Sequence, residues 1–181
     1  MRPAIFLDRD GVIIENRANY VRSWSDVSIY PQALQALASV SGSEYALVLI
    51  TNQSAVGRGI LPLHAVEGIN ARLIEAIKAA GGRIDGVYVC PHAPQDGCSC
   101  RKPEPGLILQ AAQELSLDLS RSIMIGDALS DIQAGQSAGI RKNVLVLTGR
   151  GQAQAQLPRP EKLRPFLIFA TLAEALAALV R

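Results

Sequence analysis

Short hydrophobic runs recur along the chain, and several of them stop at polar residues that can do chemistry. Three such runs are 4–7 before Asp8, 46–50 before Thr51 and Asn52, and 123–125 before Gly126 and Asp127. Runs of this length and composition are typical of buried strands in a parallel sheet. In open parallel sheets ligands bind beyond the carboxyl ends of the strands. The pattern therefore predicts that these polar residues share one site.

Segments with helical periodicity separate the hydrophobic runs. The expected helices cover 31–40, 62–80, 106–115, 131–138 and 172–180, and further strands are expected at 84–89, 143–147 and 166–169. The apolar face of the second helix comprises Leu63, Val66, Ile69, Leu73, Ile74 and Ile77. Alternation of strands and helices predicts right-handed crossovers and a sheet covered on both faces. We expect a single α/β domain over residues 1–181, with a mobile excursion at 149–165.

Composition and charge narrow the class of protein. The 181 residues are 49% apolar and 19% charged, which is ordinary for a globular domain. A net charge of +2 gives no electrostatic footprint for nucleic acid. No hydrophobic run approaches the roughly 18 residues of a membrane-spanning helix. Because Met1-Arg2-Pro3 leads directly into the first strand, we expect no signal peptide, a cytoplasmic location and no membrane partner.

Asp8 and Asp10 are the first candidates for catalysis. Two residues apart on an extended backbone, their side chains point to the same side. One carboxylate can attack phosphorus and form an aspartyl-phosphate, and the other can protonate the departing oxygen and later activate water. Gly11 allows a sharp turn after them. Taken alone, an Asp-x-Asp pair is also compatible with a turn cap beside a solvated surface charge.

Residues at the other strand ends, in the loop 90–106 and at the start of a helix supply the remaining groups that phosphoryl transfer needs. Thr51 can donate to a phosphoryl oxygen, Lys102 can neutralise it, and Asp127 can hold a metal ion, with Asp131 one helical turn further on to orient the site. Taken alone, Thr51 is also compatible with a turn residue, Lys102 with a solvated surface lysine and Asp131 with a charge at a helix start. Together with Asp8 and Asp10 they provide a nucleophile, a metal site, phosphoryl donors and an acid.

Four motifs in order carry a resemblance to a known family. They are Phe6-Leu7-Asp8-Arg9-Asp10-Gly11-Val12, Ile50-Thr51-Asn52-Gln53-Ser54, Cys98-Ser99-Cys100-Arg101-Lys102-Pro103 and Ile125-Gly126-Asp127. Over about the first 150 residues the chain resembles the haloacid dehalogenase (HAD) superfamily of phosphatases. Within it the chain is most similar to the heptose-bisphosphate phosphatase branch, with the histidinol-phosphate phosphatases as near neighbours. The resemblance implies a Rossmann-like HAD fold without a large cap.

The same resemblance implies a role for each matched residue. Asp8 is the expected nucleophile and a Mg²⁺ ligand, Asp10 the proton donor and a ligand through its backbone carbonyl, and Asp127 completes the metal site. Thr51 and Lys102 are expected to stabilise the transferring phosphoryl group, and Arg101 to recognise substrate.

The three cysteines and one histidine form a second cluster. Cys90, His92, Cys98 and Cys100 supply four ligands within eleven residues, the number that a closed tetrahedral zinc site requires. Four protein ligands leave no position for a reacting water, so we expect a structural Zn²⁺. Because the loop continues into Arg101 and Lys102, the zinc is expected to position those two cations.

Short loops must determine which ester is bound if no cap is present. The candidate substrate-binding residues are Asn16, Asn19, Tyr20, Asn52, Gln53, Ser54, Arg58 and Arg101. Arg58 could bind a second phosphate, or it could be an exposed arginine beside a glycine turn. Relatives often carry lysine directly after the fourth-motif aspartate, whereas this chain has Ala128, which removes a candidate substrate cation.

We therefore expect a Mg²⁺-dependent phosphatase, acting as a monomer on a sugar phosphate, with the 7-phosphate of a heptose 1,7-bisphosphate as the favoured ester and histidinol phosphate as the alternative. A receiver-like phospho-signalling module also combines Asp, Thr and Lys on a parallel sheet. A receiver, however, places its acceptor aspartate after the third strand, whereas Asp8 follows the first, and it carries no zinc loop.

Overall fold

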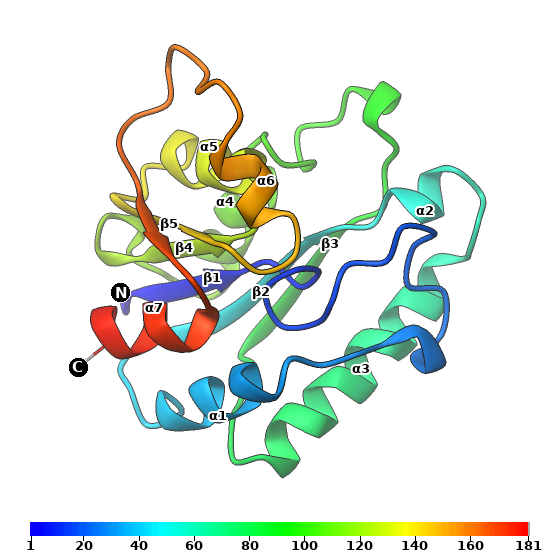
Figure 1. Ribbon diagram of the computed structural model, residues 1–181, viewed down its shortest axis with the longest axis horizontal. Coiled ribbons are helices and arrows are strands. Elements are labelled where there is room, and N and C mark those ends of the chain that lie inside the picture. The colour runs from blue at the N-terminus through cyan, green and yellow to red at the C-terminus, as the bar shows by residue number, and fades with distance from the viewer. Residues whose placement is uncertain (181) are drawn as a thin grey trace.

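The computed structural model describes residues 1–180, which build one six-stranded parallel sheet with helices on both faces (Figure 1). The strand order is β3-β2-β1-β4-β5-β6. The strands are β1 Ala4–Leu7, β2 Ala46–Asn52, β3 Gly86–Cys90, β4 Ile123–Gly126, β5 Lys142–Val146 and β6 Leu167–Phe169. The expected α/β class, parallel sheet and covered faces are confirmed.

Seven α-helices accompany these strands in the described part of the chain. They are α1 Pro31–Ser39, α2 Ser54–Gly57, α3 Leu63–Ala79, α4 Gly106–Glu114, α5 Leu129–Ser137, α6 Gly151–Ala155 and α7 Leu172–Leu179. Three 3₁₀ turns cover η1 Trp24–Asp26, η2 Pro94–Asp96 and η3 Leu119–Arg121. None of these elements forms a separate cap over the sheet, as expected.

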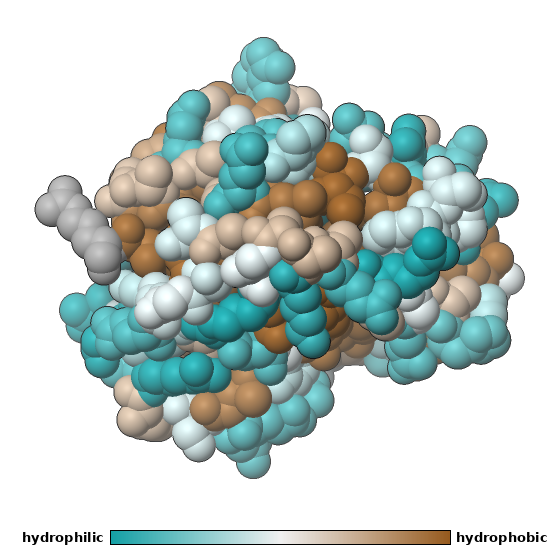
Figure 2. All heavy atoms as spheres, turned by 90° about the horizontal axis from the view of Figure 1, so that it is seen from below, coloured by the Kyte–Doolittle hydropathy of each residue, from teal (hydrophilic) through white to brown (hydrophobic). Residues whose placement is uncertain are grey.

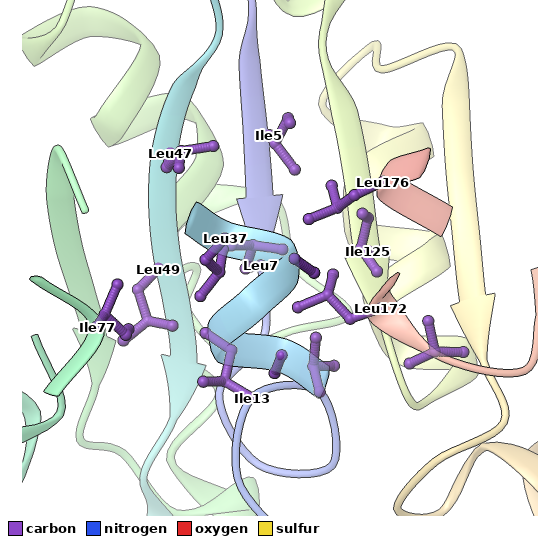
Figure 3. Close-up of a cluster of buried hydrophobic side chains, with 14 of the residues drawn as sticks. Ile5, Leu7, Ile13, Leu37, Leu47, Leu49, Ile77, Ile125, Leu172 and Leu176 are labelled. Atoms are coloured by element: carbon purple, nitrogen blue, oxygen red, sulfur yellow. The ribbon is translucent and has the colours of Figure 1, made fainter. Parts of the chain in front are cut away.

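Alternate residues of the central strands pack against different layers. On β1, Ile5 and Leu7 join the cluster with Leu37 of α1 and Leu172 of α7, as Figure 3 shows. Phe6, between them, packs in the opposite cluster, which contains residues of α4 and α5. Because side chains along a strand alternate between faces, strands that are apolar at every position must be covered on both sides.

Strand pairing brings the motif-bearing ends together. In β1, Leu7 is in register with Leu49 of β2 and with Ile125 of β4. The residues that follow therefore emerge at the same edge: Asp8 after β1, Thr51 at the end of β2 and Asp127 after β4. This edge of the sheet holds the site described below.

The structure corrects some details of the sequence predictions. Leu63 at the start of α3 is 39% exposed, so it does not belong to the buried face of that helix. The expected excursion at 149–165 begins with a short helix, α6, whose Gln-Ala alternation lacks an apolar stripe.

The surface of the α1 and α3 side is mixed in character. Figure 2 shows hydrophilic side chains over most of this face, with hydrophobic residues reaching the surface in smaller patches. Among residues 1–180, no helix combines the length and apolar character needed to cross a bilayer.

Candidate active site

Asp8 lies buried at the junction of two central strands. Its backbone N–H donates to the carbonyl of Ile125, at 3.0 Å, which fixes the chain leaving β1 against β4. One carboxylate oxygen, Oδ1, accepts the backbone N–H of Arg9 at 2.7 Å and lies 3.0 Å from Nζ of Lys102. These two contacts hold the Asp8 carboxylate in place next to the ammonium group of Lys102.

Three buried carboxylates meet beside Lys102. Oxygens of Asp8, Asp127 and Asp131 all lie within 4.8 Å of one another. Lys102 bridges two of them, because its Nζ lies 2.7 Å from Asp131 Oδ1 as well as 3.0 Å from Asp8. The other oxygen of Asp131 accepts the N–H of Ala128 at 3.0 Å and caps the start of α5. Asp131, expected only to orient the site, belongs to the carboxylate cluster itself.

Burial and crowding perturb the acid–base properties of this cluster. Burial raises the pKa of Asp8 to about 6; the charge of Lys102 opposes the shift, and Asp131 and Asp10 add to it. Burial likewise raises the pKa of Asp127, against the effect of Arg150. Burial alone would lower the pKa of Lys102, but the charges of Asp131 and Asp8 outweigh it and raise that pKa. Lys102 is therefore cationic at neutral pH.

Asp10 is oriented separately from the cluster. Arg9 donates from Nε to Asp10 Oδ2 at 3.0 Å and from NH2 to Oδ1 at 3.3 Å. Gln53 Nε2 donates to Asp10 Oδ2 at 3.0 Å and to Thr51 Oγ1 at 2.8 Å. The third side-chain nitrogen of Arg9 donates to Asn70 of α3 at 2.9 Å, so a fully buried arginine ties Asp10 to that helix. The Asp10 side chain is 24% exposed and faces the cavity.

Asn52 holds the backbone that presents Lys102. Its amide nitrogen donates to the Lys102 carbonyl at 3.0 Å, and its amide oxygen accepts the Lys102 N–H at 3.1 Å. Lys102 also donates from Nζ to the Ile50 carbonyl at 3.1 Å. Both polar atoms of Asn52 are thus engaged within the protein, although sequence reasoning assigned this residue to substrate.

A cavity of about 590 Å³ opens above these groups. Among the predicted site residues, those that line it are Asp8, Asp10, Asn16, Tyr20, Asn52, Gln53, Ser54, Arg101, Lys102 and Asp131. Thr51 and Asp127 are fully buried and do not line it. Asn19 and Arg58 do not line this cavity: Asn19 borders a smaller hollow with Tyr20, and Arg58 is exposed after α2.

Sequence reasoning missed three polar cavity-lining residues, Arg17, Ser130 and Arg150. Arg150 follows β5, the neighbour of β4, so the rule that ligands bind beyond strand ends could have located it. Its NH2 lies 3.0 Å from Asp127 Oδ1, and its backbone N–H donates to Oδ2 at 2.9 Å.

The donor set of the carboxylate cluster fits a hard divalent cation. Mg²⁺ prefers oxygen ligands, and carboxylates provide charge as well as oxygen. Asn16 adds a carbonyl oxygen that is buried and lacks a hydrogen-bond partner in the described part of the chain. This oxygen and Asp127 Oδ2 flank Gly11, at 2.6 and 2.1 Å from the position that a Cβ on Gly11 would take. Only glycine fits there, at φ +84°.

The cysteine–histidine cluster closes on itself beside the cavity. Its four ligand atoms all lie within 4.8 Å of one another. The Sγ atoms of Cys90 and Cys98 are 3.6 Å apart, those of Cys98 and Cys100 3.4 Å apart, and Nδ1 of His92 is 3.2 Å from Cys100 Sγ. Two thiolates bound to tetrahedral zinc at about 2.3 Å are about 3.8 Å apart, so the cluster could hold one such ion.

The loop that carries this cluster also contacts residues of the cavity wall. NH1 of Arg101 donates to the His92 carbonyl at 3.3 Å, which anchors a cavity-lining cation to a member of the cluster. On the other side, the Gly57 N–H donates to the Pro91 carbonyl at 2.7 Å. A Cβ on Gly57 would approach the backbone nitrogen of Ala93 to 2.5 Å, so α2 packs directly on the loop.

Comparisons with known proteins agree with this geometry. A family model described as HAD-hydrolase-like matches residues 99–175. The chain is 36% identical to D-glycero-beta-D-manno-heptose-1,7-bisphosphate 7-phosphatase of Pseudomonas aeruginosa, over 99% of both chains. It is 44% identical to the enzyme of the same name from Helicobacter pylori strain J99, over 79% of this chain and 82% of the relative.

A solved structure is similarly close. The D,D-heptose 1,7-bisphosphate phosphatase of B. bronchiseptica, crystallised with magnesium and phosphate, superposes with a TM-score of 0.89 at 36% identity, covering 98% of this chain and 97% of that one. The matched motifs, the shared sheet and identity sustained along nearly the whole length lead to one conclusion: this chain belongs to the HAD superfamily of phosphatases.

Proposed function

We propose that this phosphatase removes the 7-phosphate of D-glycero-D-manno-heptose 1,7-bisphosphate through an aspartyl-phosphate on Asp8. The observation that carries the proposal is the juxtaposition of a buried Asp8 with Lys102 at 3.0 Å, beside a cavity with several cations. The relatives that match over most of the chain bear this activity in their names, with the beta anomer specified.

In the first step, Asp8 attacks the phosphorus atom and the bond from phosphorus to the sugar oxygen breaks. Asp10, held towards the cavity by Arg9 and Gln53, gives its proton to the departing alkoxide. Lys102, which stays cationic, neutralises charge on the phosphoryl oxygens. The buried hydroxyl of Thr51 is placed by the same glutamine that orients Asp10.

In the second step, Asp10 takes a proton from water, which attacks the phosphorus of the aspartyl-phosphate. The acyl phosphate bond breaks, inorganic phosphate leaves and Asp8 is regenerated as a carboxylate. Mg²⁺, when bound, would offset the negative charge of the carboxylates and of the phosphoryl group. Asp8, Asp127 and the Asp10 backbone carbonyl are the proposed ligands, with Asp131 in place to join or orient them.

Zinc in the cysteine–histidine cluster would act structurally. Three thiolates and an imidazole satisfy four tetrahedral positions and leave none for a reacting water. Its proposed effect is to fix Arg101 and the chain that leads to Lys102.

The cavity suits a polar substrate that carries two phosphates. Arg17, Arg101 and Arg150 provide cations around the rim, and Asn16, Tyr20 and Ser54 provide groups that can pair with sugar hydroxyls. We propose that Asn19 and Arg58 contact only a part of the substrate that extends beyond the cavity, because neither residue lines the cavity. We further propose that the chain acts as a single-domain monomer.

The decisive experiment compares kcat/KM for heptose 1,7-bisphosphate and histidinol phosphate with Mg²⁺, because discrimination is the ratio of these values. We expect a preference for the heptose ester of at least about 100-fold. Equal values, or a preference for histidinol phosphate, would refute the proposed substrate. Light scattering on the same sample tests the monomer.

A further inference from the structure

Arg150 lines the cavity next to the carboxylate cluster and pairs with one of its members, Asp127. It is the N-cap residue of α6, and its side chain is 56% exposed even though its partner Asp127 is completely buried. The guanidinium donates from NH2 to Asp127 Oδ1 at 3.0 Å and from Nε to Oδ2 at 3.3 Å. Both oxygens of a proposed metal ligand are therefore shared with an arginine.

Each carboxylate of the cluster has a cation partner in the chain. Lys102 pairs with Asp8 and Asp131, and Arg150 pairs with Asp127. Lys102 is fully buried and tied to the Ile50 carbonyl, so it has little freedom. Arg150 differs, because more than half of its side chain faces solvent and the cavity.

Asp127 itself has no room to move away from the guanidinium. A Cβ on Gly11 would lie 2.1 Å from Asp127 Oδ2, and a Cβ on Gly149 would lie 2.5 Å from the same atom. The two glycines thus pack tightly against the carboxylate. A divalent cation that takes an oxygen of Asp127 therefore competes with the exposed arginine for that carboxylate.

An arginine side chain has five N–H donors, and the pair with Asp127 engages two of its nitrogens. The Arg150 side chain also lines the cavity, which, if the proposed function is right, receives phosphate. Guanidinium groups bind phosphate oxygens in a forked geometry that lysine cannot reproduce. Arg150 can therefore exchange a carboxylate partner for a phosphate partner with a small displacement.

We propose that Arg150 couples metal binding to substrate binding: it weakens the binding of a divalent cation alone by competing for Asp127, and it binds a phosphoryl group of the substrate once the cation shares that carboxylate. Arg150 is thus both a competitor for a metal ligand and a phosphate-binding residue of the site. The part of this inference that concerns substrate binding rests on the proposed phosphatase function, whereas the competition between Arg150 and the metal for Asp127 does not.

The test measures binding rather than turnover, on the full chain. The variants are Arg150→Met and Arg150→Gln, and Arg141→Met serves as a control that removes one exposed positive charge elsewhere. Mn²⁺, detected by electron paramagnetic resonance, reports metal affinity without phosphate. Calorimetry with inorganic phosphate at saturating Mn²⁺ reports binding of the phosphoryl group.

We expect both Arg150 variants to bind Mn²⁺ more tightly than wild type, on the order of tenfold, because a nearby positive charge is removed. We expect the same variants to bind phosphate more weakly, again on the order of tenfold, while Arg141→Met changes neither. Metal affinity that is unchanged or reduced would refute the competition and leave Arg150 as a support for Asp127. Unchanged phosphate affinity would refute the second part.

These outcomes are separable from the choice of substrate. If the protein failed to hydrolyse heptose bisphosphate, the opposite changes in Mn²⁺ and phosphate affinity would still support the coupling. If heptose bisphosphate were hydrolysed but the Arg150 variants bound Mn²⁺ and phosphate as wild type does, only the proposed coupling would be refuted. Should Arg150→Met fold poorly, Arg150→Gln keeps an amide that can still accept and donate near Asp127, so the sign of the Mn²⁺ change is still measured.

Discussion

The carboxylate cluster and the cysteine–histidine cluster lie at the same end of the molecule but are constructed in different ways. The first stands on the ends of the two central strands β1 and β4, and its charges are balanced by Lys102 and Arg150. The second begins at the end of the edge strand β3 and continues through a loop whose only regular element is η2. One site is shaped by the sheet, whereas the other is held by its own four side chains and by a few contacts of the loop with α2.

The difference predicts what each metal does for the fold. Removing Mg²⁺ should leave the carboxylate site in place, because the strands and ion pairs position it. Removing Zn²⁺ should release the loop, because metal binding to such a cluster is coupled to its folding. The two clusters are nevertheless connected, because Arg101 contacts His92 of one and the next residue, Lys102, pairs with Asp8 of the other.

The largest effect is expected for Asp8→Asn. An amide cannot form the aspartyl-phosphate, so kcat should fall by about 10⁴-fold or more, while the amide keeps the shape of the side chain. Phosphate release from heptose bisphosphate with Mg²⁺ measures the loss, and trapping with acid followed by mass spectrometry locates the phosphoryl group in wild type. Full turnover by Asp8→Asn would overturn the assignment of the nucleophile.

Asp10→Asn is expected to have the next largest effect. Loss of general acid–base catalysis costs between about 10²- and 10⁴-fold, and an amide can still accept from Arg9 and Gln53, so the fold is preserved. Wild type and variant should therefore differ in how kcat depends on pH, with the variant losing the limb that reports the acid. Parallel pH profiles at equal height would contradict the role of Asp10. A substrate with a good leaving group, such as p-nitrophenyl phosphate, should recover part of the loss.

The parts of this site that the sequence predicts are those marked by a pattern within a short stretch of the chain. The strand ends were found because β1 and β4 are continuous apolar runs, and the expected bounds of β1 agree with the structure. The grouping of Cys90, His92, Cys98 and Cys100 follows from their local spacing, and the structure brings the four side chains together. The fold and family follow from these ordered motifs, and both are confirmed.

What the sequence did not predict depends on contacts between distant segments. The pairing of Asn52 with the Lys102 backbone joins residues fifty positions apart, and no local pattern marks it. Arg150 lies after a strand outside the motifs, and its role follows only from β5 lying beside β4. Asn19 and Arg58 were placed at the site because they are near motifs in sequence, which does not determine whether a side chain faces the cavity.

The titration of Asp8 tests whether the carboxylate site stands without its metal. Burial raises the folded-state pKa from 3.8 to about 6, so between these pH values the folded chain binds more protons than the unfolded chain. Stability then falls as pH rises through this window, and the ionised carboxylate destabilises the fold at neutral pH. Asp8→Asn removes the titration.

In Mg²⁺-free buffer, the free energy of unfolding of Asp8→Asn relative to that of wild type should therefore increase between pH 4 and 7, by up to about 3 kcal/mol. Urea denaturation at several pH values measures the gap between the two proteins. A gap that stayed constant or narrowed with rising pH would show that Lys102 fully offsets the burial of this charge. Added Mg²⁺ should reduce the gap, because only wild type presents the carboxylate to the ion.

The smallest effect on turnover, and the sharpest contrast with the carboxylate site, is expected for Cys98→Ser. Replacing one thiolate weakens the closed ligand set, so the protein should lose its single equivalent of zinc by elemental analysis. Ser99→Ala, in the same exposed loop but outside the cluster, is the matched control and should keep the metal.

The kcat/KM of Cys98→Ser should fall only about 10- to 100-fold, the range typical of residues that support a site without touching the reaction. Asn52 still clamps the Lys102 backbone from β2, so one cation of the pair keeps its position when the loop is released. Arg101 lacks such a clamp and relies on the His92 carbonyl. The loss should thus fall mainly on KM, through Arg101, with kcat nearly kept. A loss confined to kcat would mean that the loop controls Lys102 after all, and that the sheet does not shape the carboxylate site alone.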